Sequence, residues 1–459
     1  MRNIILKVKR LILFSGDVAV LYFSLWVTLA VRYWKPVNLE LWNKHLLPFT
    51  AIFLVWLMIF FINKLYDLSI ARNNVKFYSL LINSLVWCTV IGFIFFYLTT
   101  SGISPKTVLI LDVTFFGVLV SLWRRIFNRL ILSKRLLERI VIIGLTEETI
   151  KLAKEINEKP QFGFKVTGII QLTGLDFGQF ESEDIDIITR QDKIRKYISD
   201  NKIKTVVMAM EAVDSPQVVN ELYKSLNLKM NILDLPSFAE KFTGKILINT
   251  IGQMWFLENV QEGNKQGYEL LTRVMDILLS SILLLLTAIF IPCIYAIIKI
   301  NSKGRGFFMQ QRTGKDGKKF MAVKFRTMYE NSEKNGPQWA VKEDSRITGV
   351  GKFLRKTRID EIPQLINVLR GEMSFMGPRP ERPEFISKLK EKIPFYETRL
   401  LIKPGITGWA QINFPYGASE EDALEKLQYD LYYIKNRSLI LDLSILLKTI
   451  KTVLSGGGQ

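Results

Sequence analysis

The chain has 459 residues, of which 49% are hydrophobic and 23% charged, and its 62 Lys and Arg against 43 Asp and Glu give a net charge of +19. This length and composition exclude a disulfide-stapled small fold and ordinary disorder, and they predict membrane segments within about three structural units. One His and two Cys are too few for a histidine-based metal site or a cysteine-rich zinc site and argue against a Ser-His-Asp triad. Because Cys88 and Cys293 lie in apolar runs, we expect no disulfide framework and cytoplasmic soluble parts.

Residues 1–130 are expected to form a four-span transmembrane bundle. The apolar stretches at 11–31, 46–62, 77–98 and 107–123 approach the ~20 residues that cross hydrocarbon. Basic residues gather before the first stretch, between the second and third, and after the fourth, which predicts that both ends of the bundle face the cytoplasm. Asp17 and Asp112 interrupt these stretches. Acids within a membrane are often functional, but Asp17 lies near one end and Asp112 can face another helix, so we favour structural roles.

Residues 139–262 alternate between strand and helix patterns. We expect strands at 140–143, 165–171, 205–210 and 230–233, with helices at 147–158, 192–200 and 218–226. This order predicts a Rossmann-like, doubly wound parallel sheet. The turn after the first strand has one glycine, Gly144, where a dinucleotide site needs three, and Glu147 and Glu148 would repel a pyrophosphate. A structural, oligomerising or regulatory role is therefore favoured over catalytic nucleotide binding.

A fifth apolar segment, within residues 270–300, is long enough to cross the membrane as a straight helix. A crossing would carry the dense basic stretch after Lys299 to the outside, against the positive-inside rule. Pro292 removes a helical hydrogen bond and kinks the axis. We therefore predict a re-entrant helix broken at Pro292, with a kinked true span as the alternative.

The stretch at 357–371 carries the strongest chemical signal. Its apolar residues recur at i, i+3, i+4 and i+7, as Ile362, Leu365, Ile366 and Leu369. This spacing predicts a helix with one apolar face that stops at Gly371, with Pro363 in its first turn. Asp360 and Glu361 then lie near the helix N-terminus, where free amides stabilise carboxylates and phosphates. An isolated Asp360 could simply cap the helix.

Two glycine- and proline-rich loops follow this stretch. The first, at 375–383, holds Arg379 and Arg382 between prolines, and arginine forks match phosphate oxygens. The second, at 403–413, contains Trp409 and Gln411 and is either an ordinary loop or a place where backbone approaches a nucleotide. A basic and aromatic stretch at 307–328 precedes both loops.

Together these blocks resemble the bacterial sugar transferase family, the monotopic phosphoglycosyl transferases, over residues from about 270 to 455. With the four spans and the Rossmann-like region, the whole chain resembles the long polyprenyl-phosphate hexose-1-phosphate transferase branch. Two departures stand out: the turn at 302–306 lacks the usual proline, and 414–417 differs from smaller members, so the sugar preference is not carried over.

The resemblance implies a two-step exchange in a catalytic domain at 301–455. Asp360 would attack a nucleotide diphosphate sugar such as a UDP-hexose, and undecaprenyl phosphate would then take the phosphosugar from it. Glu361 would bind Mg²⁺. The remaining expected substrate contacts are Lys324, Arg326, Arg379, Arg382, Arg399, Gln411 and Asp430.

By the same resemblance, the enzyme would initiate exopolysaccharide, capsule or O-antigen assembly on the cytoplasmic face of the bacterial inner membrane. Its partners would be the two substrates, membrane lipid and a second copy in a homodimer, without nucleic acid. Two alternatives remain open: a membrane-anchored regulatory protein that senses a nucleotide without turnover, and a glycosyl transferase that moves sugar without its phosphate. Residues 438–454 would form either a core helix or an interfacial one.

Overall fold

A computed structural model describes residues 2–98, 105–131, 137–172, 185–209, 215–260, 265–330, 332, 344–414, 417 and 419–454. Residue 210 of the third expected strand and residues 415–416 of the second departing loop lie outside the described residues. The chain folds into two compact units, Met1–Phe238 and Ala239–Gln459. Cys88 and Cys293 are both free, the first buried and the second exposed.

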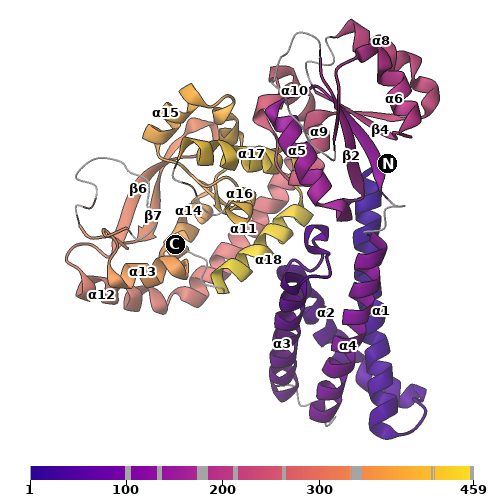
Figure 1. Cartoon of the computed structure of the whole chain (residues 1–459). Coiled ribbons are helices and arrows are strands. Elements are labelled where there is room, and N and C mark those ends of the chain that lie inside the picture. Colours follow the sequence, from indigo (N-terminus) through magenta and orange to yellow (C-terminus); the bar gives the residue numbers. More distant parts are fainter. Residues whose placement is uncertain are drawn as a thin grey trace. The chain divides into compact units, whose positions relative to one another are not determined.

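Four long apolar helices open the first unit and confirm the predicted spans (Figure 1). They are α1 (Arg2–Tyr33), α2 (Leu39–Ile62), α3 (Val75–Leu98) and α4 (Pro105–Ile131). The start of α2 is capped by Asn38, whose side chain accepts a hydrogen bond from the Leu41 amide. Large aromatic side chains fill the interior, among them the buried Phe49, Trp56 and Phe116. The bundle core is therefore built from rings that contact one another across helices.

The two acids of the spans are paired inside the bundle. Arg124 donates from Nε to Asp17 Oδ1 at 3.1 Å, forms a further ion pair with the same carboxylate, and donates to the Leu65 carbonyl at 2.6 Å. Ser24 donates to Asp112 Oδ1 at 2.7 Å. All four of these side chains are buried. Asp17 and Asp112 thus tie helices together, which agrees with the structural roles expected for them.

The α/β region of the first unit is a parallel five-stranded sheet with the order β3-β2-β1-β4-β5, as the alternating pattern predicts. The strands are β1 (Glu138–Ile143), β2 (Phe164–Ile170), β3 (Asp186–Ile188), β4 (Thr205–Met208) and β5 (Asn231–Asp234). Strand β3 is not among the predicted strands, because three residues are too few to show an alternation. The helices include α5 (Glu147–Glu158), α6 (Ile194–Asp200) and α8 (Pro216–Lys224). One face of the sheet, with Val141 and Ile143, packs on α6 and α8.

Protein groups fill the turn at the end of β1. Gly144 has φ of 109°, and a Cβ there would lie 2.5 Å from that of Ala209. The side chain of Thr146 accepts from the Thr149 amide, and Thr149 reciprocates, so a capping box closes the start of α5. This turn therefore lacks the open, glycine-lined approach of a dinucleotide fingerprint.

The second unit combines short strand pairs with helices around one core. Strands β6 (Phe307–Thr313) and β7 (Lys319–Phe325) form an antiparallel hairpin, and β8 (Ser374–Met376) pairs in parallel with β9 (Gly405–Thr407). The helices are α9 (Leu235–Thr243), which begins in the first unit, α10 (Gln253–Asn259), α11 (Gln266–Thr287), α12 (Phe290–Asn301), α13 (Gly349–Lys356), α14 (Leu365–Arg370), α15 (Pro383–Lys392), α16 (Trp409–Asn413), α17 (Glu420–Asn436) and α18 (Leu439–Leu454). In α18, Ile445 is fully buried while Ile440 and Leu443 are exposed, so this helix has both a core side and an exposed apolar side.

The fifth apolar segment is two helices and not one. Helix α11 ends at Thr287, α12 begins at Phe290, and α12 runs at a steep angle to α11 (Figure 1). Pro292 lies in the first turn of α12, where its missing amide breaks the hydrogen-bond ladder at the junction. The helix is therefore interrupted at Ala288 and Ile289, shortly before Pro292, and re-entry into the membrane stays a prediction.

Both ends of this broken segment pack on the second unit. In α11, Arg273 donates to the carbonyls of Val368 and Leu369 at 2.5 and 2.7 Å, and Asp276 accepts from the Phe375 amide at 2.9 Å. In α12, Ile298 is buried against the second unit. From residue 277 to the end of α11 the helix rises about 16 Å, roughly half of the ~30 Å hydrocarbon thickness.

Candidate active site

Asp360 and Glu361 lie in a 3-10 helix, Ile359–Gln364, which runs into the short helix α14. The single helix predicted for this stretch is therefore wrong in its first part. Its end is as predicted, because Gly371 closes α14 with φ of 81°. The predicted apolar face is also rotated: Ile366 is 38% exposed, whereas Asn367 is fully buried. Polar side chains face inward here because they meet charged and backbone groups of other segments.

Glu361 is surrounded by basic residues. Its Oε1 accepts from Lys324 Nζ at 3.1 Å and from Arg379 Nη2 at 2.7 Å, and Arg358 Nη1 lies 3.5 Å from Oε2. The residue is 6% exposed. Burial by itself would raise the pKa of Glu361, but the charges of Arg379, Lys324 and Arg358 outweigh it and hold the pKa well below its usual range. Glu361 is thus a fixed negative charge.

Asp360 is in a different situation although it is the next residue. It is 8% exposed, and its carboxylate accepts no hydrogen bond from the part of the chain that the structure describes. Burial, together with the charge of Glu361, raises the pKa of Asp360 to about 6, against the opposing charges of Lys324, Arg379 and Arg355. At neutral pH this carboxylate is ionised yet free of donors. Such a group is suited to act as a nucleophile.

Asn367 holds the two acids against the strand that carries Lys324. It donates to the Met321 carbonyl at 2.8 Å and to Glu372 at 2.7 Å, and it accepts from the Val323 amide at 3.1 Å. The bonds to Met321 and Val323 join α14 to β7 directly before Lys324. Asn367 carries no signal in the sequence, because its role depends on a strand more than forty residues away.

Arg399 and Asp430 support Arg379 through its backbone. Arg399 Nη2 donates to the Arg379 carbonyl at 3.0 Å and to Asp430 Oδ2 at 2.9 Å, while Nη1 donates to the Tyr396 hydroxyl at 2.7 Å. Burial raises the pKa of Asp430 to about 6, although Arg399 acts in the opposite direction. The structure therefore brings both predicted residues close to the loop of Arg379, as positioning groups.

Arg326 closes the turn after α12. Its guanidinium donates to the carbonyls of Lys303 and Ser302 at 2.7 and 2.8 Å and to the Ser302 hydroxyl at 2.8 Å. A Cβ at Gly304, where φ is 111°, would lie 2.1 Å from this guanidinium. The glycine and the arginine thus explain how this turn forms without the proline that the sequence lacks.

Arg382 and Gln411 are also engaged locally. The Arg382 guanidinium lies 3.5 Å from Glu384 and packs over the Phe385 ring. Gln411 Nε2 donates to the Ile406 carbonyl at 3.1 Å. The described contacts therefore connect Lys324 and Arg379 directly to Glu361, and they connect Arg399 and Asp430 to the backbone of Arg379.

Two further arginines belong to the site although sequence reasoning passed over them. Arg358 faces Glu361, as described above. The charge of Arg355 lowers the pKa of Asp360. The Arg355 side chain is held in place by a hydrogen bond that its Nε donates to Thr327 Oγ1 at 2.8 Å. Both stand shortly before Asp360 in the sequence, so a search for cations within one or two turns of the acid pair would have found them.

A metal ion fits this site only with help from a substrate. The described residues contain no group of three or more His, Cys, Asp or Glu that could hold a metal. Magnesium, however, is commonly held by one or two carboxylates together with substrate phosphates and water. Among the described residues, none donates to the Asp360 oxygens, and Glu361 Oε2 has the Arg358 contact at 3.5 Å. The pair can therefore accept an ion that arrives with a diphosphate.

Sequence comparisons place this site within a known family. Residues 267–456 match the family described as bacterial sugar transferase. A UDP-glucose:undecaprenyl-phosphate glucose-1-phosphate transferase of Klebsiella pneumoniae is 33% identical, over 71% of this chain and 69% of that protein. The chain belongs to the bacterial sugar transferase family.

Other relatives of this bacterial sugar transferase match over shorter parts. A UDP-N-acetylgalactosamine-undecaprenyl-phosphate N-acetylgalactosaminephosphotransferase of Aeromonas hydrophila is 42% identical, over 50% of this chain and 53% of that protein. A UDP-glucose:undecaprenyl-phosphate glucose-1-phosphate transferase of Escherichia coli is 37% identical over 54% of each chain. The matched part thus spans about half the length of these two relatives. Residues 62–236 match a family described as a CoA-binding domain, which covers part of the bundle and all five strands of the sheet.

Proposed function

We propose that this bacterial sugar transferase moves a sugar-1-phosphate from a UDP-hexose to undecaprenyl phosphate. The named activities of its relatives in Klebsiella, Aeromonas and Escherichia support this substrate class. The observation that carries the proposal is the buried, donor-free carboxylate of Asp360 beside Glu361, which three basic side chains hold in place. Burying a charge of this kind lowers the stability of the folded protein. Such groups are found most often at functional sites.

The reaction proceeds in two balanced displacements. A carboxylate oxygen of Asp360 forms a bond to the phosphorus that carries the sugar, while the bond from that phosphorus to the bridging oxygen breaks and UMP leaves as an anion. The phosphosugar is then an acyl phosphate on Asp360. In the second step a phosphate oxygen of undecaprenyl phosphate attacks the same phosphorus, and the Asp360 carboxylate leaves. Neither step needs a proton, because nucleophile and leaving group are both anions.

Charge neutralisation is the task of the surrounding cations. Lys324 and Arg379 bind Glu361 in the structure, and both act electrostatically on Asp360, as does Arg355. A diphosphate entering the site would bring negative charge that these groups offset. Magnesium, held by Asp360 or Glu361 Oε2 together with the diphosphate, would supply further stabilisation of the developing charge.

We also propose that the helix pair α11 and α12 enters and leaves the membrane on one side. Support comes from the break at Pro292, from the attachment of both ends to the second unit, and from the short rise of α11 beyond residue 277. The basic residues after Lys299 then stay on the cytoplasmic face of the inner membrane, where UDP-sugars are available. The exposed apolar side of α18 would lie at the same interface.

Within this proposal the remaining parts have supporting roles. The bundle at 1–130 anchors the chain, the sheet at 139–262 has a structural or regulatory role, and 301–455 performs catalysis. The product would initiate exopolysaccharide, capsule or O-antigen assembly, with the enzyme acting as a homodimer. Enzyme purified with and without chemical cross-linking would test the last point.

The decisive test is single turnover with UDP-hexose and no acceptor. Asp360→Asn should release no UMP, because an amide is a poor nucleophile, and intact-mass analysis of the wild-type protein should find one phosphohexose on Asp360. Asp316→Asn is the matched control, since Asp316 is an exposed carboxylate at the tip of the β6–β7 hairpin. Normal UMP release by Asp360→Asn would remove the proposed nucleophile.

The identity of the released nucleotide separates the alternatives. UMP supports phosphosugar transfer, whereas UDP would indicate a glycosyl transferase that moves sugar alone. A protein whose melting temperature rises with UDP-sugar but which releases neither nucleotide, with or without undecaprenyl phosphate, would instead be a nucleotide-sensing regulator.

A further inference from the structure

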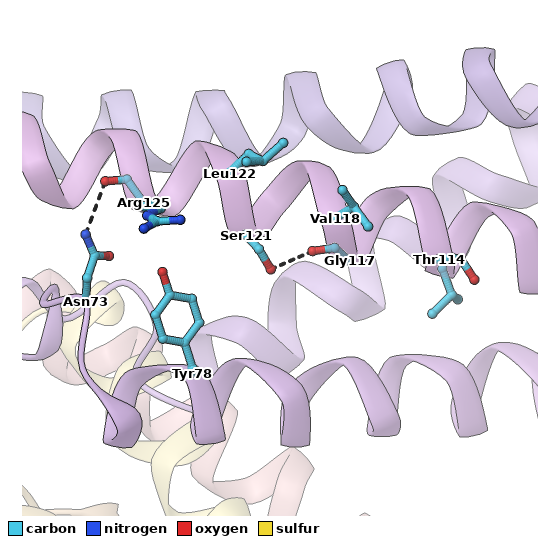
Figure 2. Close-up of a pocket in the computed structure, with 9 residues that line it drawn as sticks. Asn73, Tyr78, Thr114, Gly117, Val118, Ser121, Leu122 and Arg125 are labelled. Carbon is cyan, nitrogen blue, oxygen red and sulfur yellow. Dashed lines mark hydrogen bonds between the residues drawn. The ribbon is translucent and has the colours of Figure 1, made fainter.

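A groove runs along the surface of the transmembrane bundle between α3 and α4. Its volume is about 670 Å³, within the ~300–1,000 Å³ range of ligand pockets. It is lined by Asn73, Tyr78, Val113, Thr114, Gly117, Val118, Ser121, Leu122 and Arg125 (Figure 2). The groove is polar at the end near Arg125. Toward Val113 it is lined by small and apolar side chains.

The groove exists because the two helices diverge. In the middle of the pair, a Cβ at Gly117 would lie 3.4 Å from Leu85, and farther along one at Gly92 would lie 3.1 Å from Leu109. At these levels α3 and α4 are in close contact. Toward the other end of the pair the space between them opens, and the lining residues from Gly117 to Arg125 surround it.

The polar end of the groove contains hydrogen-bond donors that pair with no anionic side chain of the described residues. The guanidinium of Arg125 and the hydroxyl of Tyr78 point toward one another across the gap (Figure 2). Neither group makes a hydrogen bond or an ion pair within the described residues, and Arg125 is exposed. Its neighbour Arg124, in contrast, is buried against Asp17. Of two adjacent arginines at one level of α4, one has a protein anion and the other faces the groove.

The loop before α3 fixes this end. Asn73 donates to the Arg125 carbonyl at 3.3 Å and accepts from Asn128 Nδ2 at 3.1 Å. These bonds hold the loop to α4 and leave the Arg125 side chain directed into the open space (Figure 2). Val118 and Leu122 are 56% and 51% exposed, so the groove has an apolar rim open toward the surrounding lipid.

We propose that this groove binds an anionic glycerophospholipid, with its phosphate on Arg125 and Tyr78 and one acyl chain along Gly117 and Thr114. Charge complementarity favours the phosphate. The guanidinium of Arg125 lies near the end of an apolar helix, where it can pair with a lipid phosphate at the depth of the headgroups. The open rim means that the occupant enters from the bilayer, where glycerophospholipids are far more abundant than a polyprenyl carrier. The proposal stands apart from the transfer reaction.

Native mass spectrometry of the full chain in detergent tests this assignment. The probes are phosphatidylglycerol and phosphatidylcholine, added at equal concentrations. Wild type should retain one phosphatidylglycerol in preference to phosphatidylcholine, and Arg125→Gln should weaken that binding about tenfold. Arg129→Gln is the matched control, because it removes one exposed charge from the same helix outside the groove.

A second variant separates binding from folding. Ser121→Leu keeps every charge but fills the groove, so it should also lose the phospholipid while its melting temperature stays close to that of wild type. Equal retention of phosphatidylglycerol by the Arg125 and Arg129 variants would overturn the proposal. Displacement of phosphatidylglycerol by equimolar undecaprenyl phosphate would overturn it too, since the groove would then hold the carrier lipid.

Discussion

The carboxylates of Asp360 and Glu361 are adjacent in the chain but have opposite pKa shifts. Glu361 receives Lys324 and Arg379, so its charge is stabilised, whereas Asp360 is buried without a donor and its pKa is about 6. The negative charge of Glu361 also raises the pKa of Asp360, because two neighbouring carboxylates repel one another when both are ionised. The described cationic groups therefore pair with Glu361 and leave the proposed nucleophile, Asp360, without a paired cation.

The pH dependence of the donor step should follow Asp360. Its carboxylate must be ionised to attack, so UMP release in single turnover should fall about tenfold per pH unit below pH 6 and be level above it. The acceptor is omitted because a phosphate monoester has its own pKa of about 6. A rate that is unchanged down to pH 5 would contradict this pKa for the nucleophile.

The contribution of Asp360 to folding stability should fall as the pH rises, whereas the rate of UMP release should increase. Because the pKa of Asp360 is raised from 3.8 to about 6, its charge costs nothing below pH 4 and about 3 kcal/mol above pH 6. Asp360→Asn should therefore melt at a higher temperature than wild type at pH 7.5, with a smaller difference at pH 5. The exposed Asp316→Asn should show no such dependence. A difference that grows toward low pH would refute the assigned shift.

Arg399 is expected to act on catalysis through Arg379. Arg399→Lys keeps the charge but loses the fork that joins the Arg379 carbonyl to Asp430, so the donor-step kcat should fall by up to about 100-fold with a modest change in KM. Arg382→Lys is the comparison, because that side chain contacts Glu384 instead. Equal losses in the two variants would argue against a specific role for Arg399.

At the scale of elements, the contact between α14 and β7 sets the geometry of the acid pair. Asn367→Leu removes the bonds to Met321 and Val323 and leaves these part-buried backbone groups without their side-chain partner, which destabilises the contact. We expect a lower melting temperature together with a loss of UMP release. Asn413→Leu, in a more exposed position, should change neither as strongly. A folded Asn367→Leu with full activity would show that the contact is dispensable.

The proposed re-entry of α11 and α12 predicts on which side of the membrane the two ends of the pair lie. Cysteines placed at Glu258 and at Lys299 should react with an impermeant thiol reagent from the same side of membrane vesicles, because the helix break at Pro292 returns the chain to its side of entry. The native Cys293 is replaced by Ser in this experiment, since it is exposed in the structure. Labelling from opposite sides would make α11 and α12 a kinked span.

At the scale of the whole molecule, the second unit has a hydrophobic core of its own. This unit contains Asp360, Glu361 and, among the described residues, the basic side chains that pair with Glu361. A chain of residues 239–459 should therefore keep the donor step within about tenfold of the full protein, measured as UMP release in detergent. A complete loss in a folded fragment would mean that the first unit takes part in the chemistry.

Much of this protein was determined by local sequence. Apolar runs fixed the four spans, alternating patterns fixed the parallel sheet, and Pro292 marked the helix break, because these features depend on neighbours within a few turns of chain. Asp360 and Glu361 were predicted as site residues from their motif and its resemblance to a family. These signals are short-range, so they survive without knowledge of the fold.

Only the tertiary structure decided what each charged residue does. Lys324 and Arg379 reach Glu361 from a strand and a loop, Arg399 reaches the Arg379 backbone, and Arg326 turns away to close a glycine turn. A sequence lists these basic residues as equivalents. Their roles differ because side-chain direction and burial are set by contacts between segments that are distant in the chain, and those contacts form only when the chain folds.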